Sequence, residues 1–523
     1  GEGDQSSVLA QSSSPGAPAS GPTSVHQTST SISLDWSAPS SDGSSGDDAS
    51  GYRLYNVAGD PAVLLYAGAE SAYEQVGLTA GTSYSYAVSA VSAAGESPST
   101  STLVQYTAPA APTGLSSSGW TTSGFDVTWV APAVGDGPAV TGYTLYERVT
   151  YEMADVGSAG GVPDNVLQTM LTQSIDTVVV DTVAYDGSAS TDLTTSLSGL
   201  SGGVSYDYVV AARSSAGEGD RSTALSVSTS PPAPGSLASV SQTTSSITLS
   251  WSAPAVTTGS AVTGYKLYVD NGVTGSPSTV VTCSGGALDT TCTASGLDGG
   301  VSYSFEVSAL STTGESDRSS LLAQSTAPAA VAGTMTFSSV TTTSMVLEWT
   351  APSGATPTGY MVYRDDGDSQ TPSIVVFDGN ALTATVSGLT GGTSYRYMVA
   401  ALSAAGVGDV SGLSTQSTLP VAPLGLSSDT QTSTSVTLSW SASVVSGGSA
   451  VTSYKVYRND GSSAGAGLSS TAAAETADGS TTTATLSDLS PGLLYSFAVS
   501  AVSAAGEGDQ SSVLAQSSSP GAP

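Results

Sequence analysis

A tryptophan-containing pattern recurs five times along the sequence and limits the folds that the chain can adopt. The copies read LDWSAP, VTWVAP, LSWSAP, LEWTAP and LSWSAS, and their tryptophans are Trp36, Trp129, Trp251, Trp349 and Trp440. Successive copies lie 91 to 122 residues apart, which is an ordinary length for one domain. The repeat therefore predicts five similar domains in series rather than one large fold.

Two further signatures accompany each tryptophan. The first follows shortly after it and reads GYRLY, GYTLY, GYKLY, GYMVY or SYKVY. The second is a late stretch such as SYSYAVSAVS, in which Tyr84, Tyr86, Val88 and Ala90 share one face. Such alternation is typical of strands, and a helical turn is expected only at Asp164–Gln173. Many short strands between Gly, Ser, Pro and Asp clusters predict all-β sandwiches.

On these residues the units resemble fibronectin type III domains. The resemblance rests on the early tryptophan, the following tyrosine pair, and a late L-x-x-G-x-x-Y-x-Y/F-x-V-x-A strand that ends in A-G. It implies an all-β tandem array of seven-stranded sandwiches that forms a rod, with the five tryptophans in the cores. It also implies that a tyrosine corner, with its hydroxyl bonded to backbone, is formed by Tyr84, Tyr206, Tyr303, Tyr395 and Tyr495.

The repeat also predicts the domain boundaries. The domains are expected at residues 18–108, 109–231, 232–327, 328–419 and 420–518, after the terminal strand of a preceding repeat (1–17) and before the start of the next linker (519–523). Short Pro/Ala-rich pieces join them, and such joints behave as semi-rigid spacers. Because a strand of eight to ten residues spans about 30 Å, five extended domains would span on the order of 150 Å.

The two ends of the chain are identical in sequence. GEGDQSSVLAQSSSPGAP occupies both Gly1–Pro18 and Gly506–Pro523, an offset of 505 residues. The duplicated piece begins inside a domain, directly after a predicted strand at Tyr495–Ala505. We interpret the chain as a window of a longer repeating molecule. That molecule is either one covalent chain or an assembly in which the strand Gln5–Gln11 is donated between subunits.

Charge and composition exclude several classes of function. The sequence has 42 acidic and 10 basic residues, a net charge of −32, and is expected to repel nucleic acid and anionic membranes. No apolar run approaches the length of a membrane-spanning helix. A catalytic triad needs a base, and His26 is the only histidine. We therefore expect no enzyme activity and no cofactor, with Ca²⁺ as the one candidate ion.

The two cysteines, Cys283 and Cys292, flank a loop-like stretch between probable strands. We interpret them as a disulfide that closes a hairpin, which implies an oxidising compartment and hence an extracellular or cell-surface protein. Two separately buried thiols are the alternative.

Clustered aspartates are candidate Ca²⁺ ligands. The densest groups are Asp42, Asp47 and Asp48, and Asp365, Asp366 and Asp368, and neither follows the EF-hand pattern. Acidic residues also recur beside the joints, in turns such as AGEGD. Ca²⁺ bound there would stiffen the array, and the alternative is a polar turn without metal.

The second domain carries an insertion at about residues 147–195, which contains Met153, Met170 and a predicted strand at Val178–Val183. Long insertions in small domains are often functional, so contacts between subunits are expected here. An elongated hairpin packing on its own domain is the alternative. Trp120, outside the repeat signature, is a further interface candidate, and packing against a neighbouring domain or strand is its alternative.

Together these features predict a structural repeat segment of a long extracellular fibre, stalk or filamentous surface appendage. Its expected partners are copies of itself or a continuation of the same repeating chain. Ser/Thr/Pro stretches such as Ser97–Thr102 could accept O-linked glycans. The alternatives are a cell-surface adhesin or glycan/protein-binding array, and the spacer array of a secreted polysaccharide-degrading enzyme.

Overall fold

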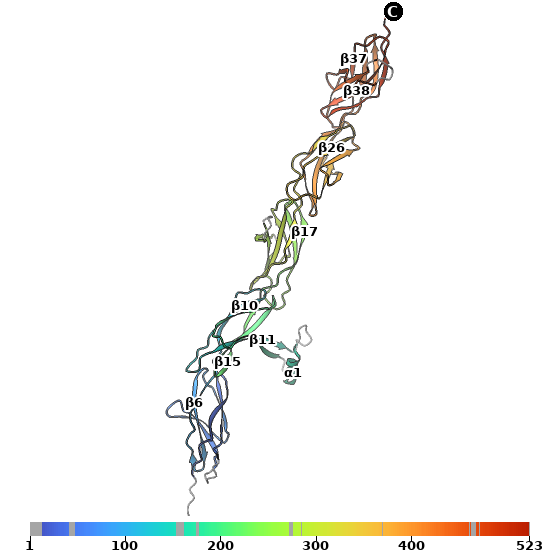
Figure 1. The fold of residues 1–523 in the computed structure, drawn as a ribbon. Coiled ribbons are helices and arrows are strands. Elements are labelled where there is room, and N and C mark those ends of the chain that lie inside the picture. The colour runs from blue at the N-terminus through green and yellow to red at the C-terminus, as the bar shows by residue number, and fades with distance from the viewer. Residues whose placement is uncertain are drawn as a thin grey trace, which may run out of the picture. The chain divides into compact units, whose positions relative to one another are not determined.

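A computed structural model describes residues 13–40, 48–152, 162–173, 177–270, 276–283, 285–368, 370–459, 461, 467–469 and 471–521. In these ranges the chain forms strands β1 to β40 and one helix, α1 (Asp164–Gln173) (Figure 1). By internal contacts it divides into two compact units. The first is Gly1–Pro234 with Ala253–Tyr265 and Ser308–Arg318, and the second is Gly235–Ser252 with Lys266–Val307 and Ser319–Pro523.

One sandwich of a three-stranded and a five-stranded sheet is repeated five times, so the all-β prediction is confirmed. In the first domain the small sheet has the order β1-β2-β5, and in the large sheet β4-β3-β6-β7 are joined by β8, which pairs with β6. The small sheet consists of β1 (Ser20–Gln27), β2 (Ser31–Ser37) and β5 (Ala72–Val76). The large sheet consists of β3 (Gly51–Asn56), β4 (Val63–Gly68), β6 (Ser83–Ser92), β7 (Gly95–Glu96) and β8 (Leu103–Tyr106).

The second and third domains have the same topology. The second contains β9 (Thr113–Ser118), β10 (Gly124–Val130) and β13 (Thr194–Ser198), and then β11 (Gly142–Glu152), β12 (Thr177–Gly187), β14 (Ser205–Ser214), β15 (Gly217–Arg221) and β16 (Leu225–Ser228). The third contains β17 (Gly235–Gln242), β18 (Ser246–Ser252) and β21 (Thr291–Ser295), and then β19 (Gly264–Val269), β20 (Thr279–Val281), β22 (Ser302–Ser311), β23 (Gly314–Glu315) and β24 (Leu322–Ser325).

The fourth and fifth domains repeat it again. The fourth contains β25 (Thr336–Ser338), β26 (Ser344–Glu348) and β29 (Thr383–Ser387), and then β27 (Gly359–Arg364), β28 (Ile374–Gly379), β30 (Ser394–Ser403), β31 (Gly406–Val410) and β32 (Ser414–Ser417). The fifth contains β33 (Leu424–Gln431), β34 (Val436–Ser441) and β37 (Thr483–Leu486), and then β35 (Val451–Arg458), β36 (Ala474–Glu475), β38 (Leu494–Ser503), β39 (Gly506–Gln510) and β40 (Leu514–Ser517).

The core of each domain lies between its two sheets. In β34, Val436, Leu438 and Trp440 are buried and alternate with less buried residues, because successive side chains of a strand point to opposite faces. The ring of Trp440 packs edge-on against Tyr454, with the ring centroids 5.4 Å apart. The other four tryptophans of the repeat are also buried in their domains.

A tyrosine hydroxyl ties the start of each late strand to the preceding turn. Tyr84 Oη accepts a hydrogen bond from the backbone N–H of Thr79 at 2.9 Å. The same bond, at 2.8 or 2.9 Å, joins Tyr206 to Ser201, Tyr303 to Asp298, Tyr395 to Thr390 and Tyr495 to Ser490. These bonds hold the turn that precedes the late strand in each domain.

The insertion of the second domain forms a long hairpin and a helix. Strands β11 and β12 have 11 residues each and pair from Tyr143 opposite Gly187 to Glu152 opposite Thr177. Helix α1 forms over the range where a helical turn is expected from the sequence, and it contacts β12. The second domain is thus longer than the others because of an elongated hairpin.

Helix α1 buries Val166 and Met170 against the chain itself. Met170 is fully buried, so it is not presented to another molecule, which corrects its prediction as an interface residue. Met153 lies outside the described residues, as does the strand predicted at residues 5–11.

Candidate functional site: the joints between domains

In four of the five domains, a glutamate anchors the acidic turn after the late strand to its own domain. In the fifth domain this turn reads GEGD and begins β39. Glu507 accepts hydrogen bonds from Tyr457 Oη at 2.5 Å, Ser500 Oγ at 2.6 Å and Lys455 Nζ at 3.1 Å. Because Tyr457 and Lys455 lie on β35 and Ser500 on β38, these bonds fix the turn to the five-stranded sheet.

These contacts shift the pKa values of the groups involved. Burial of Glu507 opposes its ionisation, but the hydrogen bonds from Ser500, Tyr457 and Lys455 outweigh burial and lower its pKa. Burial and the bond to Glu507 raise the pKa of Tyr457. The bond to Glu507 also raises the pKa of Lys455. The glutamate is therefore held as a carboxylate.

Other domains use the same anchor. In the first domain Glu96 accepts hydrogen bonds from Ser89, Tyr55 and Arg53, and the bond from Ser89 is the largest cause of its lowered pKa. In the second domain Glu218 accepts from Tyr146 Oη at 2.8 and 2.9 Å. The fourth domain departs from the pattern, because Val407 stands at this position.

The aspartate of the same turn faces the preceding domain. In the second unit Asp509 Oδ2 accepts a hydrogen bond from Thr342 Oγ1 at 2.7 Å, and Asp409 Oδ2 accepts one from Thr244 Oγ1 at 2.6 Å. In the first unit Asp220 accepts from Ser29, and Asp317 accepts from Thr122. All four hydroxyls lie in the turn between the first two strands of their domain. One hydroxyl–carboxylate contact therefore recurs at four junctions.

A glycine in the left-handed region adds a backbone bridge at each joint. Gly392 has a φ of 66°, donates its N–H to Leu419 O at 2.8 Å, and accepts from the N–H of Ser446 at 2.8 Å. Because Leu419 belongs to the linker and Ser446 to the next domain, the backbone of one residue joins three segments. The equivalent glycines are Gly81, Gly203 and Gly300, with φ of 62°, 70° and 71°. Such φ values favour glycine, which has no Cβ.

A second glycine brings the acidic turn directly onto the linker. A Cβ on Gly508 would lie 2.0 Å from the carbonyl oxygen of Pro420, and one on Gly219 would lie 2.0 Å from that of Pro109. No side chain fits at that separation. In the sequence GEGD the glutamate thus anchors the turn, this glycine contacts the linker, and the aspartate reaches the preceding domain.

The first domain lacks the aspartate of this arrangement. Its turn reads GESP, so Pro98 stands where the other four domains carry aspartate. The joint hydroxyls and their aspartate partners were not singled out from the sequence. Their signal is a Ser/Thr triplet before the second strand of every domain, at residues 28–30, 121–123, 243–245, 341–343 and 432–434.

The aspartates predicted as Ca²⁺ ligands do not gather into one group. Asp365 is buried and accepts from the backbone N–H of Arg396 at 3.0 Å and from its Nε at 3.2 Å. A hydrogen bond between the exposed carboxyls of Asp366 and Asp368 raises the pKa of the first and lowers that of the second.

The other predicted group is described in part. Asp48 is exposed, while Asp42 and Asp47 lie outside the described residues. In the part of the chain that the structure describes, no three His, Cys, Asp or Glu side chains are placed to share a metal ion.

The remaining predicted site residues lie apart from one another. Cys283 and Cys292 form a disulfide in the third domain. Trp120 is 41% exposed in the second domain, and its indole N–H donates to Ser117 Oγ at 3.3 Å. His26 is exposed on β1. None of them takes part in the joint contacts described above.

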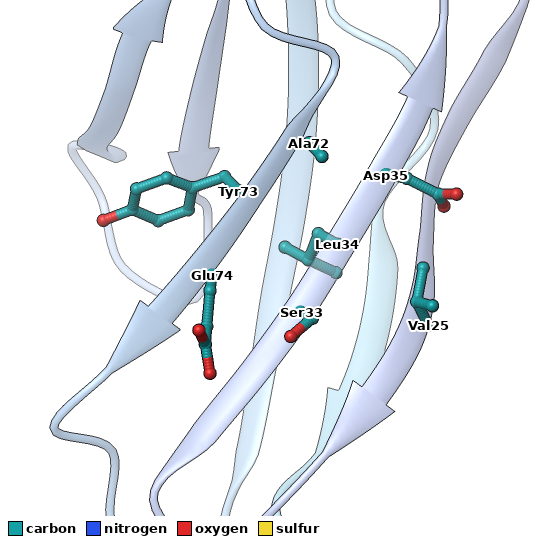
Figure 2. Close-up of a pocket in the computed structure, with 7 residues that line it drawn as sticks. All are labelled: Val25, Ser33, Leu34, Asp35, Ala72, Tyr73 and Glu74. Atoms are coloured by element: carbon teal, nitrogen blue, oxygen red, sulfur yellow. The ribbon is translucent and has the colours of Figure 1, made fainter.

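An open hollow of about 430 Å³ lies on the three-stranded sheet of the first domain (Figure 2). It is lined by Val25, Ser33, Leu34, Asp35, Ala72, Tyr73 and Glu74. Its polar groups are two carboxylates and two hydroxyls, and Asp35 already accepts a hydrogen bond from Thr23.

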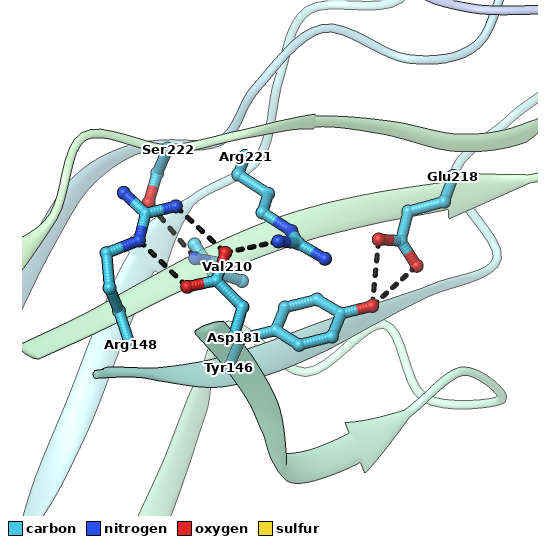
Figure 3. Close-up of polar contacts among 7 residues, drawn as sticks. All are labelled: Tyr146, Arg148, Asp181, Val210, Glu218, Arg221 and Ser222. Carbon is cyan, nitrogen blue, oxygen red and sulfur yellow. Dashed lines mark hydrogen bonds and ion pairs between the residues drawn. The ribbon is translucent and has the colours of Figure 1, made fainter. Parts of the chain in front are cut away.

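An ion-pair cluster lies midway along the hairpin in the second domain (Figure 3). Asp181 accepts from Arg148 Nε at 2.8 Å and Nη2 at 2.9 Å, and it also accepts from Arg221. The guanidinium of Arg221 lies over the ring of Tyr146, 4.2 Å from its centroid. The hydrogen bond from Arg148 is the largest cause of the lowered pKa of Asp181.

Among the residues that the structure describes, no helix is long and apolar enough to cross a membrane.

Comparison with curated proteins finds relatives that include two glucanases and a chitinase. The chain is 32% identical over 314 residues to Exoglucanase B of Cellulomonas fimi, which covers 55% of the chain and 25% of that protein. It is 39% identical over 192 residues to Chitinase A1 of Niallia circulans. This match covers 35% of the chain and 24% of that protein. It is 33% identical over 292 residues to Endoglucanase B of Cellulomonas fimi, which covers 50% and 25%. The chain thus spans about a quarter of the length of these relatives.

A family model for the fibronectin type III domain matches five consecutive segments of the chain. The matched residues are 16–106, 110–228, 231–325, 327–417 and 421–517. These segments coincide with the five sandwiches and leave only the linkers between them. The chain belongs to the fibronectin type III family and is a tandem array of five such domains.

Proposed function

We propose that this array acts mechanically, as a repeat segment of a long extracellular fibre, stalk or surface appendage. The observation that carries the proposal is the joint, which uses equivalent positions at four junctions. A flexible tether between independent domains would not need a hydroxyl–aspartate contact at every junction. Recurrence of the contact indicates that the angle between neighbouring domains matters to the function.

The joint resists bending through several weak contacts that act together. At the fourth junction these are the bond from Thr342 to Asp509, the two backbone bonds of Gly392, and the packing of Gly508 on Pro420. Each hydrogen bond contributes roughly 0.5–1.5 kcal/mol. Bending the joint would disturb the contacts on both sides of a short proline-containing linker. The array should therefore be stiffer than domains joined by Gly/Ser linkers.

The disulfide and the relatives support a location outside the cell. A disulfide between Cys283 and Cys292 is expected to persist in an oxidising compartment. In the stretch 97–102, Ser97 is buried, whereas Ser99, Ser101 and Thr102 are exposed and suit the proposed O-linked glycans. The net charge of −32 would keep neighbouring molecules solvated.

A second candidate is a spacer array within a secreted polysaccharide-degrading enzyme. The similarity to two glucanases and a chitinase favours it, because the chain aligns with about a quarter of each of these proteins. The mechanical task would be the same, with the array holding catalytic and binding parts at a set distance. No catalytic role falls on these five domains in either case.

Small-angle scattering of the full chain tests the mechanical role. A variant that removes the four joint hydroxyls, S29A/T122V/T244V/T342V, should show a broader distribution of distances and a smaller average dimension than the unaltered protein. The matched control, S116A/T248V/S338A/T437V, removes four hydroxyls that bond within single domains and should leave the curve unchanged. A flexible unaltered chain, or equal effects of both variants, would contradict the proposal.

Electron microscopy of the native material separates the two candidates. A fibre should show an axial repeat that accommodates five domains. A spacer array should instead appear as a thin segment between globular parts of a single molecule.

A further inference from the structure

Strand β12 forms an unusually long free edge in the second domain. In its sheet the strand order is β12-β11-β14-β15, and among the described residues β12 pairs with β11 alone. It has 11 residues, whereas the corresponding edge strands β4, β20, β28 and β36 have six, three, six and two. The free N–H and C=O groups of such an edge can template pairing with another strand.

The edge also lacks the protection that its counterparts carry. Proline stands two residues before three of them, as Pro61 before β4, Pro277 before β20 and Pro372 before β28. Proline near an edge strand discourages pairing with other strands. The nearest proline before β12 is Pro163, which precedes helix α1. The sequence of β12, TVVVDTVAYDG, contains no lysine and a run of three valines.

Of the two carboxylates on β12, Asp186 is exposed near the end of the strand, whereas Asp181 is neutralised. Asp181, in the middle of β12, has its side chain 6% exposed and is paired with both Arg148 and Arg221 (Figure 3). In a chain of net charge −32, this cluster of one carboxylate and two guanidinium groups is locally not acidic. A second acidic molecule is therefore repelled less here than by the rest of the chain.

Exposed valines flank that cluster along the strand. Val179 and Val183 are 53% and 59% exposed, and they lie two residues to either side of Asp181, on the same face of the hairpin. Helix α1 contacts β12 and buries its own Val166 and Met170, yet these two valines stay open to solvent. Exposed β-branched residues beside a free edge favour a cross-strand partner.

We propose that β12 pairs edge to edge and antiparallel with β12 of a second copy of this chain. The contact would be isologous, because the same strand serves both molecules under a two-fold axis. With that axis perpendicular to the sheet, Val179 and Val183 of the two copies lie on one face of a continuous sheet. A second copy is the favoured occupant because it brings an edge of equal length whose charge is balanced in the same way. This inference goes beyond the mechanical role and does not depend on it.

Analytical ultracentrifugation of the full chain tests the proposal. The protein should form a dimer with rising concentration, and more readily at about 1 M than at about 0.15 M NaCl, because salt screens the repulsion between acidic molecules. The variant V179K/V183K should dimerise at least tenfold more weakly. The control V63K/L64K places the same charges on the exposed residues of β4, a guarded edge, and should dimerise like the unaltered protein.

Hydrogen exchange provides a second measurement that needs no variant. Amides of residues 178–184 should exchange more slowly at concentrations where the dimer forms than where the monomer prevails. A protein that stays monomeric at both salt concentrations would overturn the proposal. The proposal would also be overturned if V179K/V183K formed the dimer as readily as the unaltered protein. It would equally be overturned if dimer formation did not slow the amide exchange of β12. The mechanical role is tested by small-angle scattering at concentrations where the protein is monomeric. Absence of the dimer would therefore not affect that test.

Discussion

Thr342 of the fourth domain donates a hydrogen bond to Asp509 of the fifth, although the two residues are 167 positions apart in the sequence. The oxygen atoms, Oγ1 of Thr342 and Oδ2 of Asp509, lie 2.7 Å apart. The turn that carries Asp509 is itself anchored by Glu507 to its own sheet. A rigidly held turn can orient a neighbouring domain, whereas a mobile one could not.

Replacing Asp509 by alanine should loosen one joint and leave the domains folded. The change removes the acceptor of Thr342 Oγ1. Because Asp509 is exposed, we expect a loss of about 1.5 kcal/mol of local stability, the lower end of the range for a hydrogen bond to a charged group. Hydrogen exchange should become faster in the linker at residues 419–423 and in the loop at 444–449. Asp429→Ala is the control, because Asp429 accepts from Ser439 within its own domain. Equal changes in both variants would show that the joint contact has no special role.

Replacing Gly508 by alanine should displace the acidic turn from the linker. The new Cβ would meet the carbonyl oxygen of Pro420 at 2.0 Å, which is far inside van der Waals contact. Gly412→Ala is the matched control, since nothing lies within 4 Å of a Cβ at that position. Scattering should show a more flexible fourth joint in the first variant alone. An unchanged scattering curve for Gly508→Ala would mean that the linker can move to accommodate the new Cβ without making the joint more flexible.

The anchor of the acidic turn should weaken in acid. The pKa of Glu96 and that of Glu507 are lowered in the folded protein, so both favour folding when ionised. Their contribution is fully present above the pKa of an unfolded glutamate, about 4.3, and is lost as the pH falls through the lower folded value. Calorimetry at falling pH should show destabilisation below about pH 4.3. Glu507→Gln should reduce this pH dependence, and the exposed control Glu70→Gln should preserve it.

Removing the disulfide should destabilise the third domain selectively. The bond between Cys283 and Cys292 spans nine residues, and a loop of this length predicts a loss of about 2–3 kcal/mol in the variant C283A/C292A. Calorimetry should show one transition at lower temperature and the others unchanged. Reducing agent should reproduce the effect in the unaltered protein and add nothing in the variant. A shift of every transition would show that the domains unfold as one unit.

The individual domains could be predicted from the amino-acid sequence alone. In β34 the alternation of Val436, Leu438 and Trp440 identifies a buried face, because strand geometry makes every second side chain point the same way. A helical turn was likewise expected at residues 164–173, where helix α1 forms. These signals are local, since each depends on neighbours a few residues apart.

The contacts between residues far apart in the sequence could not be predicted and are seen only in the folded protein. Ser29 and Asp220 are 191 positions apart, and each lies in a turn of ordinary amino-acid composition. Nothing in the sequence near either residue indicates that they form a hydrogen bond. Neighbours in sequence could also mislead, as Asp365 turns inward to Arg396 while Asp366 and Asp368 stay exposed. A strand or helix follows from the order of its own residues. A joint or a metal site depends on where separate loops lie once every domain has folded.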